Sequence, residues 1–397
     1  MKKLLVVLLS LGLIAAFSMT ASAADVKFSG QYYVTGAYES NRSLKDTDAT
    51  NSLAVFFQRV RVQTVFQVAE GLKFTTRFDA LEKYWGGTTA ATVGTEDKTN
   101  SRSTTFASLQ ENIEFEQGYV TFNTAAGMFQ IGYQDADTWG TGFADTPGTR
   151  PRIMYIVPAG PVTIGAVYEK VYDTTGHGST GTAAALYGKA DADWDNYALS
   201  ATYKFKGGNT GLLFKFVNAA TTRPGFDYRA KQYVLAPYLK ATYGPVYVEG
   251  ELVFLAGKTK EYDTAAAGTD VKATGWGGYA LAKMKMGPAY FGAQVGFSSG
   301  NDTTTADKDE SGPKSSVSWV PALIFGESNV KTWIGGANHG GANGVTYSTD
   351  KQNLLLFNIF GGFNPTPKLN VEARLSTMKA DKVAANYVSD KYGTEFD

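Results

Sequence analysis

The chain has 397 residues and no cysteine, and its 37 Lys and Arg residues balance 37 Asp and Glu residues. Without cysteine there are no disulfides, thiolate nucleophiles, Cys-ligated metals or CxxCH haem attachment. A nearly neutral chain is also not suited to binding nucleic acid. Glycine (44), tyrosine (23) and phenylalanine (24) are plentiful, which fits a fold with many turns and bands of aromatic side chains.

The N-terminus is typical of a secretory signal peptide. Lys2 and Lys3 precede an apolar run at residues 4–16, and Ala21-Ser22-Ala23 follows it, which predicts a signal peptide over residues 1–23 with cleavage after Ala23. The run is too short for a membrane-spanning helix, and no run of about 18 apolar residues follows. Removing two lysines leaves 35 basic against 37 acidic residues, a formal net charge of −2. We expect an exported protein without a helical anchor.

The mature chain, residues 24–397, alternates apolar and polar residues in segment after segment. In residues 72–80, for example, one face carries Leu72, Phe74, Thr76, Phe78 and Ala80, and the other carries Lys73, Thr75, Arg77 and Asp79. This period of two is typical of β-strands. A soluble sandwich buries the apolar face, whereas an outer-membrane barrel turns it toward lipid and keeps charge in a watery lumen. Export favours the barrel.

The alternating segments follow one another along the whole mature chain. The clearest are residues 26–38, 54–68, 72–82, 162–168, 197–205, 233–243, 246–254, 280–286, 291–297 and 369–375. Residues 153–157 and 212–216 alternate weakly, and 354–363 is uniformly apolar. Strands of about 9–11 residues can cross a bilayer on a tilted path.

Short turns and long polar stretches separate these segments in turn. The short turns fall near residues 69–71, 123–126, 158–161, 206–210, 244–245, 287–288 and 364–368, and the long stretches cover 40–52, 83–110, 135–151, 173–193, 219–230, 257–274, 299–352 and 379–391. Such asymmetry is typical of barrels with short periplasmic turns and long extracellular loops. The sequence therefore predicts an all-β fold, a transmembrane antiparallel β-barrel of about 16 strands.

Two segments leave the strand number between 16 and 18. Residues 317–325, inside the longest loop, could add a strand or fold over the barrel mouth. The last alternating run, residues 392–397, is short and ends in Asp397, so we expect the sequence to be truncated at its C-terminus.

Turn positions also predict which residues face each other. Centring the first hairpin on Glu70 pairs Phe66 with Phe74, Val62 with Phe78, Gln63 with Arg77, and Arg61 with Asp79. Centring two others on 244–245 and 287–288 pairs Tyr243 with Val246, Leu239 with Gly250, Met284 with Phe291, and Ala282 with Ala293. Apolar meets apolar and polar meets polar, as a consistent register requires. We expect an ion pair between Arg61 and Asp79 on the wall.

The signal peptide, the alternating strands and the loop rhythm resemble the Gram-negative outer-membrane porins of the general diffusion type, over essentially the whole mature chain. The resemblance implies a homotrimer in the bacterial outer membrane, in contact with lipid and lipopolysaccharide. It also implies that the third long loop, residues 135–151, enters the lumen and opposes a basic row. The loop residues are Asp135, Asp137, Trp139 and Asp145, and the basic row is Arg59, Arg61 and Arg77.

Other charged residues share the polar phase of their strands and are expected to line the pore. They are Lys204, Lys283, Lys285 and Arg374, with the acids Asp79, Glu114, Glu116, Glu249, Glu251 and Glu372. Lys or Arg facing lipid at the midplane costs about 2–4 kcal/mol, which favours the lumen. The mixed signs predict weak ion selectivity. Aromatic girdle candidates are Phe66, Phe74, Tyr203, Phe205, Tyr243 and Tyr290.

The expected function is passive diffusion of small hydrophilic solutes and ions, without cofactor, metal or catalysis. Four alternatives stay open: a substrate-specific channel, the barrel sleeve of a porin-cytochrome electron conduit, a barrel hydrolase using His177 or His339, and a soluble β-sandwich. The acidic residues Asp302, Asp307, Asp309 and Glu310 of the longest loop could bind divalent cations near lipopolysaccharide, although a solvated loop is the simpler interpretation.

Overall fold

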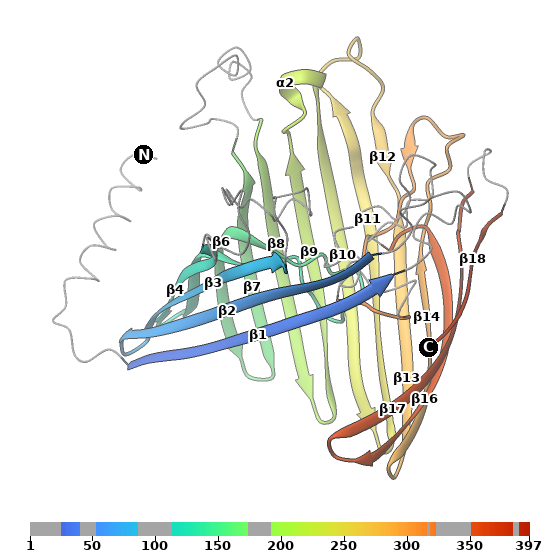
Figure 1. The fold of residues 1–397 in the computed structure, drawn as a ribbon. Coiled ribbons are helices and arrows are strands. Elements are labelled where there is room, and N and C mark those ends of the chain that lie inside the picture. The colour runs from blue at the N-terminus through green and yellow to red at the C-terminus, as the bar shows by residue number, and fades with distance from the viewer. Residues whose placement is uncertain are drawn as a thin grey trace.

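In the computed structural model the described residues are 25–39, 53–85, 113–173, 192–315, 318–322, 351–383 and 389–397. Their long strands form one antiparallel sheet in which consecutive long strands are neighbours (Figure 1). The expected signal peptide, His177 and His339 lie outside the described residues. No helix in the described part of the chain is long and apolar enough to cross a membrane, and the helix α2 (Arg223–Phe226) has four residues.

Of the 18 strands in the described ranges, β12 (Val271–Ala273) and β15 (Lys308–Asp309) have three and two residues, which leaves 16 long strands, the expected number. The long strands are β1 (Asp25–Glu39), β2 (Leu53–Ala69), β3 (Leu72–Tyr84), β4 (Glu114–Thr124), β5 (Gly127–Ala136), β6 (Gly148–Ala159), β7 (Val162–Tyr172), β8 (Trp194–Phe205), β9 (Gly208–Ala219), β10 (Tyr228–Tyr243), β11 (Val246–Tyr262), β13 (Trp276–Met286), β14 (Ala289–Ser298), β16 (Leu354–Thr366), β17 (Leu369–Lys379) and β18 (Lys391–Phe396).

Short turns join the strands at one end of the sheet, which we call the short-turn end (Figure 1). Two of them are the dipeptides Gly244-Pro245 and Gly287-Pro288, in which the glycines have φ of 58° and 62°. A positive φ at the first turn residue fits the type II′ turn, whose twist matches that of the flanking strands. Proline then fixes φ at the second position. The Gly-Pro dipeptide therefore determines the turn type in both hairpins.

The register agrees with every predicted pair. Phe66 faces Phe74, Val62 faces Phe78, Gln63 faces Arg77 and Arg61 faces Asp79. Tyr243 faces Val246 and Leu239 faces Gly250, while Met284 faces Phe291 and Ala282 faces Ala293. Matching the two faces of each hairpin was therefore sufficient to place these strands.

Several strands extend further than predicted at the long-loop end. β11 continues to Tyr262, because Glu261 pairs with both Arg229 and Lys231 on the neighbouring strand at 2.9 Å. Likewise β6 begins at Gly148, inside the stretch expected to be a loop. The third long loop is therefore shorter than predicted and covers residues 137–147.

The sheet differs from a closed barrel at its edges. β1 pairs with β2, β18 pairs with β17, and no ladder between described residues joins β1 to β18. β18 has six residues, against fifteen in β1. The segment 318–322 is not a strand, and it packs instead on the sheet. The extra strand considered for residues 317–325 is therefore not formed in their described part.

The two faces of the sheet are chemically opposite. On the outer face, large apolar side chains are exposed on strands from β1 to β18, among them Phe28, Leu199, Leu252, Phe357 and Ile359. The inner face, on which residues 137–147 pack, carries the charged pairs. Tyr290 was expected in an outer girdle but lies on the inner face, where its hydroxyl donates to Glu372 at 2.6 Å.

Candidate functional site

Paired charges line the inner face of β2 and β3. The guanidinium of Arg61 donates two hydrogen bonds of 2.6 Å to the two carboxylate oxygens of Asp79, as expected from the register. Arg59 lies 3.4 Å from the same carboxylate and stacks over the ring of Tyr33. Asp79 is 2% exposed. One buried carboxylate therefore balances two guanidinium groups.

Arg77 on β3 pairs with acids of β4 and β5. It donates to both oxygens of Asp135, at 3.1 and 3.3 Å, and lies 3.9 Å from Glu116 on β4. Glu114 faces Asp79 in the register. Asp135 belongs to β5, so Arg77, Arg59 and Arg61 are all paired with acids of the wall, and the expected opposition between the loop acids and this basic row stays a prediction.

Residues 137–147 form an inner loop that crosses the inner face from β6 toward β13. At its start, Asp137 lies 2.6 Å from Lys215 on β9 and 2.5 Å from Arg150 on β6. Burial alone raises the pKa of Asp137, but the adjacent Lys215 and Arg150 outweigh it and hold the pKa below the usual value. Asp137 therefore stays ionised and fixes the loop to two strands.

The middle of the inner loop is held by buried hydrogen bonds. The indole N–H of Trp139 donates to the carbonyl of Ala236 at 2.8 Å. Thr141 donates to Glu251 through its backbone N–H at 2.7 Å and its hydroxyl at 2.8 Å. Glu251 is 3% exposed, so this expected pore-lining acid lies under the loop. A buried carboxylate with two donors holds the loop to β11.

Asp145 closes the inner loop on itself by accepting the backbone N–H of Trp139 at 2.8 Å. Burial raises the pKa of Asp145 to about 7, against the opposing effects of that N–H and of the nearby Lys240. The side chain therefore titrates near neutral pH, unlike Asp137 eight residues earlier.

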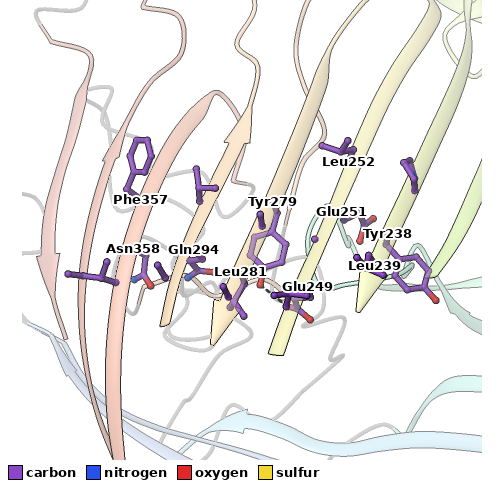
Figure 2. Close-up of a pocket in the computed structure, with 18 of the residues that line it drawn as sticks. Tyr238, Leu239, Glu249, Glu251, Leu252, Tyr279, Leu281, Gln294, Phe357 and Asn358 are labelled. Carbon is purple, nitrogen blue, oxygen red and sulfur yellow. Dashed lines mark hydrogen bonds between the residues drawn. The ribbon is translucent and has the colours of Figure 1, made fainter. Parts of the chain in front are cut away.

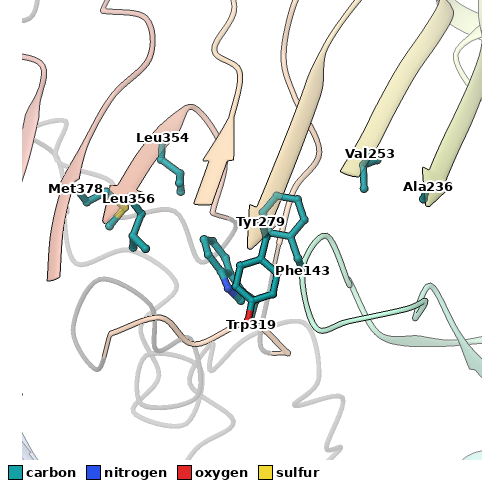
Figure 3. Close-up of a cluster of buried hydrophobic side chains, with 8 residues drawn as sticks. All are labelled: Phe143, Ala236, Val253, Tyr279, Trp319, Leu354, Leu356 and Met378. Atoms are coloured by element: carbon teal, nitrogen blue, oxygen red, sulfur yellow. The ribbon is translucent and has the colours of Figure 1, made fainter. Parts of the chain in front are cut away.

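A second loop folds onto the same face and meets the first. Phe143, at the tip of the inner loop, stacks on Tyr279 of β13 and lies edge-on to Trp319, with ring centroids 5.9 and 5.1 Å apart (Figure 3). The N–H of Ala144 donates to the Ser315 hydroxyl at 2.7 Å. A Cβ at Gly142 would lie 2.3 Å from the Ser318 carbonyl oxygen, so the backbones touch.

The described part of the second loop, residues 311–315 and 318–322, is anchored by Arg374 of β17. The guanidinium donates to the carbonyls of Pro321 at 2.7 Å and Val320 at 3.2 Å, and to Glu372 at 2.6 Å. Asn358 also donates to Pro321, at 3.0 Å. Arg374, expected to line the pore, is therefore covered by this loop.

The sequence did not single out the charged residues on β6, β7 and β9. Arg152 lies 3.5 Å from Glu169, and Lys215 lies 3.8 Å from the same carboxylate. Asn196 donates to Glu169 at 3.0 Å. Lys215 occupies the polar phase between Leu212, Phe214 and Phe216, a signal that could have identified it. Arg150 fell in the expected loop 135–151 and Arg152 between that loop and the weakly alternating run 153–157, so their phase was hidden.

Lys204, Lys283, Lys285 and Glu249 lie on the inner face toward the short-turn end, as the strand phase indicates. Glu249 accepts hydrogen bonds from the hydroxyls of Tyr247 and Tyr279, at 2.5 and 2.7 Å. The structure therefore brings the expected pore-lining residues to one face, but it covers Glu251 and Arg374 with loops.

The acidic patch of the longest loop makes contacts within the loop. Asp302 accepts from the N–H and hydroxyl of Thr304, at 3.0 and 2.6 Å, and Glu310 accepts from the N–H of Asp302. Thr304 lowers the pKa of Asp302. Within the described ranges no group of three or more His, Cys, Asp or Glu side chains is arranged to hold a metal ion.

The outer face of β10 to β18 carries an apolar groove of about 1100 Å³ (Figure 2). Small residues form part of its lining, including Gly250 and Ala280, which face each other. Alternation puts its larger residues, such as Leu252 and Phe357, on the face opposite Glu251. Its lining also includes the inner-face residues Glu249, Glu251 and Tyr279. The apolar part of the lining, with its small residues, lies on the outer face.

No protein-family model matches the chain, and no curated protein sequence matches it. Among solved structures, the anion-selective porin from Comamonas acidovorans is similar at 13% identity and a TM-score of 0.44, over 94% of this chain and 93% of that chain. A loop L8 deletion mutant of OmpT, an outer membrane protein of Vibrio cholerae, is similar at 8% identity and a TM-score of 0.44, over 91% and 94%. A further porin is similar at 16% identity and a TM-score of 0.41, over 92% and 96%. The likeness is one of fold.

Proposed function

We propose that the chain is an outer-membrane porin whose water-filled channel passes small hydrophilic solutes and ions by diffusion. The observation that carries the proposal is the contrast between the faces of the sheet. Apolar side chains are exposed along one face from β1 to β18, far more than a soluble monomer exposes. Paired charges and an inward-folded loop occupy the other. Closing the sheet gives an apolar exterior and a polar lumen.

The mechanism involves no covalent step. Solutes move down their gradients through the space left by the inner loop, and the charged side chains along the wall set the ion preference. Because Arg61, Arg77, Lys215 and their carboxylate partners alternate along the wall, we expect selectivity between small ions to be weak.

The test is conductance of the isolated protein. The mature chain, purified in detergent and added to a planar bilayer, should form stable pores with an ohmic current in KCl. On a gel, the unheated protein should migrate differently from the boiled protein. A chain that stays soluble without detergent and forms no pores would contradict the proposal.

The outer groove supports a proposed contact between copies in the expected homotrimer. Small side chains such as Gly250, Ala280, Ala282 and Ala293 allow a neighbouring barrel to approach closely there. An unheated sample should then migrate as a trimer, and Ala282→Trp should weaken it. Unchanged trimer migration in this variant would place the contact elsewhere.

A further inference from the structure

The inner face contains a separate pocket of about 460 Å³ at the short-turn end, between β10, β11, β13, β16 and β17. Its charged lining residues are Lys283, Lys285, Arg374, Glu249 and Glu372. Three cations against two carboxylates give the pocket a net positive charge. It lies apart from the inner loop, because none of residues 137–147 lines it.

The two carboxylates are already engaged by the wall. Glu249 accepts from two tyrosine hydroxyls. Glu372 accepts from the Tyr290 hydroxyl and from Arg374, each at 2.6 Å. Arg374 in turn holds the second loop through two carbonyls. These three charges are therefore satisfied before any solute arrives.

The two lysines differ from the other charged residues of the pocket. In the described part of the chain, no ion pair joins Lys283 or Lys285 to a carboxylate within 4.0 Å. The ammonium of Lys283 lies 3.9 Å from the centroid of the Tyr290 ring, a cation-π contact that leaves its other N–H donors for a ligand. The excess positive charge of the pocket is concentrated on these two side chains.

Apolar surface completes the pocket beside the lysines. Leu281 interrupts the polar phase of β13 and lines the pocket, as do the rings of Tyr247 and Phe360. A few placed polar groups within apolar walls are typical of small-molecule sites, and the volume lies in the range of about 300–1000 Å³ usual for them.

We propose that this pocket binds small organic carboxylates that carry a flat apolar ring, with the carboxylate on Lys283 and Lys285 and the ring against Phe360, Leu281 and Tyr247. The proposal deepens the proposed function, because such a site at the short-turn mouth makes the channel selective for these solutes. The transport role of the pocket rests on the proposed pore, whereas the binding of the carboxylate does not.

Binding is tested by equilibrium dialysis of radiolabelled benzoate against the detergent-folded mature chain. We expect the radiolabelled benzoate to bind saturably. Unlabelled benzoate should displace it, whereas equal concentrations of acetate or benzamide should not. The double variant Lys283→Met, Lys285→Met should weaken binding about tenfold or more, because it removes two charge-assisted contacts. The matched control Lys206→Met, Lys368→Met removes two lysines from exposed turns at the same end and should leave binding unchanged.

The outcomes separate this inference from the porin proposal. No saturable benzoate binding, or equal binding by the pocket and control variants, overturns the inference even if the pore conducts KCl. Failure to conduct KCl overturns the porin function even if benzoate binds. If the double variant does not fold by the gel-shift criterion, each single variant is measured, and binding equal to wild type in both overturns the inference.

Discussion

At the scale of single residues, the carboxylate of Asp79 is shared by two cations of the wall. It balances Arg61 at 2.6 Å and Arg59 at 3.4 Å while almost fully buried. A buried carboxylate with such partners contributes through its hydrogen bonds, and its loss leaves two cations facing each other. The pair is therefore a determinant of both wall stability and lumen charge.

The variant Asp79→Asn should shift ion preference toward anions and destabilise the fold by about 1.5–3 kcal/mol, the range for hydrogen bonds to charged groups. Reversal potential in a KCl gradient and urea unfolding measure the two effects. Arg61→Gln is the matched control, since it should shift the preference toward cations. A reversal potential that moves the same way in both variants would contradict the assignment of this pair to the pore.

Asp145 predicts a pH effect on the inner loop. Its pKa is about 7 in the docked loop and near 3.8 when solvated, so the docked state binds more protons between these values. Docking is therefore strongest below pH 3.8 and weakens as the pH rises to about 7, with no further change above. Hydrogen exchange of residues 137–147, corrected for intrinsic rates, should be faster at pH 8 than at pH 5. Asp145→Asn should abolish this difference, and a difference that persists would refute the role of Asp145.

At the scale of elements, the strands were predictable because their information is local. Alternation and the turn at Glu70 were sufficient to pair Arg61 with Asp79, and alternation and a Gly-Pro turn were sufficient to pair Met284 with Phe291. The docking of the inner loop was not predictable in detail, since Thr141 meets Glu251 across 110 residues without any periodic signal. The expectation that this loop enters the lumen came only from the resemblance to outer-membrane porins. Tyr290 was misplaced although its own alternation with Gln294 indicated the inner face.

The Thr141 contact predicts how firmly the inner loop is held. Thr141→Val removes the hydroxyl that donates to buried Glu251 and should loosen the loop by about 1–3 kcal/mol, because it leaves the carboxylate with one donor fewer. Limited proteolysis within residues 137–147 measures this. The control is Thr146→Val, in the same loop, whose hydroxyl has no hydrogen bond to any described residue. Equal cleavage of the two variants would show that the Glu251 contact does not hold the loop.

The aromatic contact between the two loops predicts that they move together. Phe143→Ala removes the ring that contacts both Tyr279 and Trp319. The substitution should destabilise the docked loops by about 3–5 kcal/mol if the surrounding side chains do not fill the space. We expect faster hydrogen exchange in both residues 137–147 and 318–322, with higher single-channel conductance. Loosening confined to the inner loop would mean that Arg374, Asn358 and the direct contact of Trp319 with Tyr279 hold the second loop without Phe143.

At the scale of the whole molecule, the fold places a different solvent on each side of one sheet, and adjacent residues of β8 test this directly. Leu199 is 60% exposed on the outer face, while Ser200 lies on the inner face opposite Gly165. In a membrane barrel, Leu199→Lys puts an ammonium into hydrocarbon and should cost about 2–4 kcal/mol near the midplane. Ser200→Lys puts the same group into the aqueous lumen, beside a residue without a side chain, and should cost much less.

The measurement is urea unfolding of both variants folded into lipid vesicles, which holds the strand, the depth and the introduced group constant. In a soluble sheet with a water-facing outer surface, Leu199→Lys would be tolerated and the order of the two costs would reverse. The sign of the difference therefore tests the orientation of the sheet without depending on conductance. It also tests closure, because the inner face stays aqueous within a bilayer only when the sheet closes around a lumen and leaves no edge unpaired in lipid.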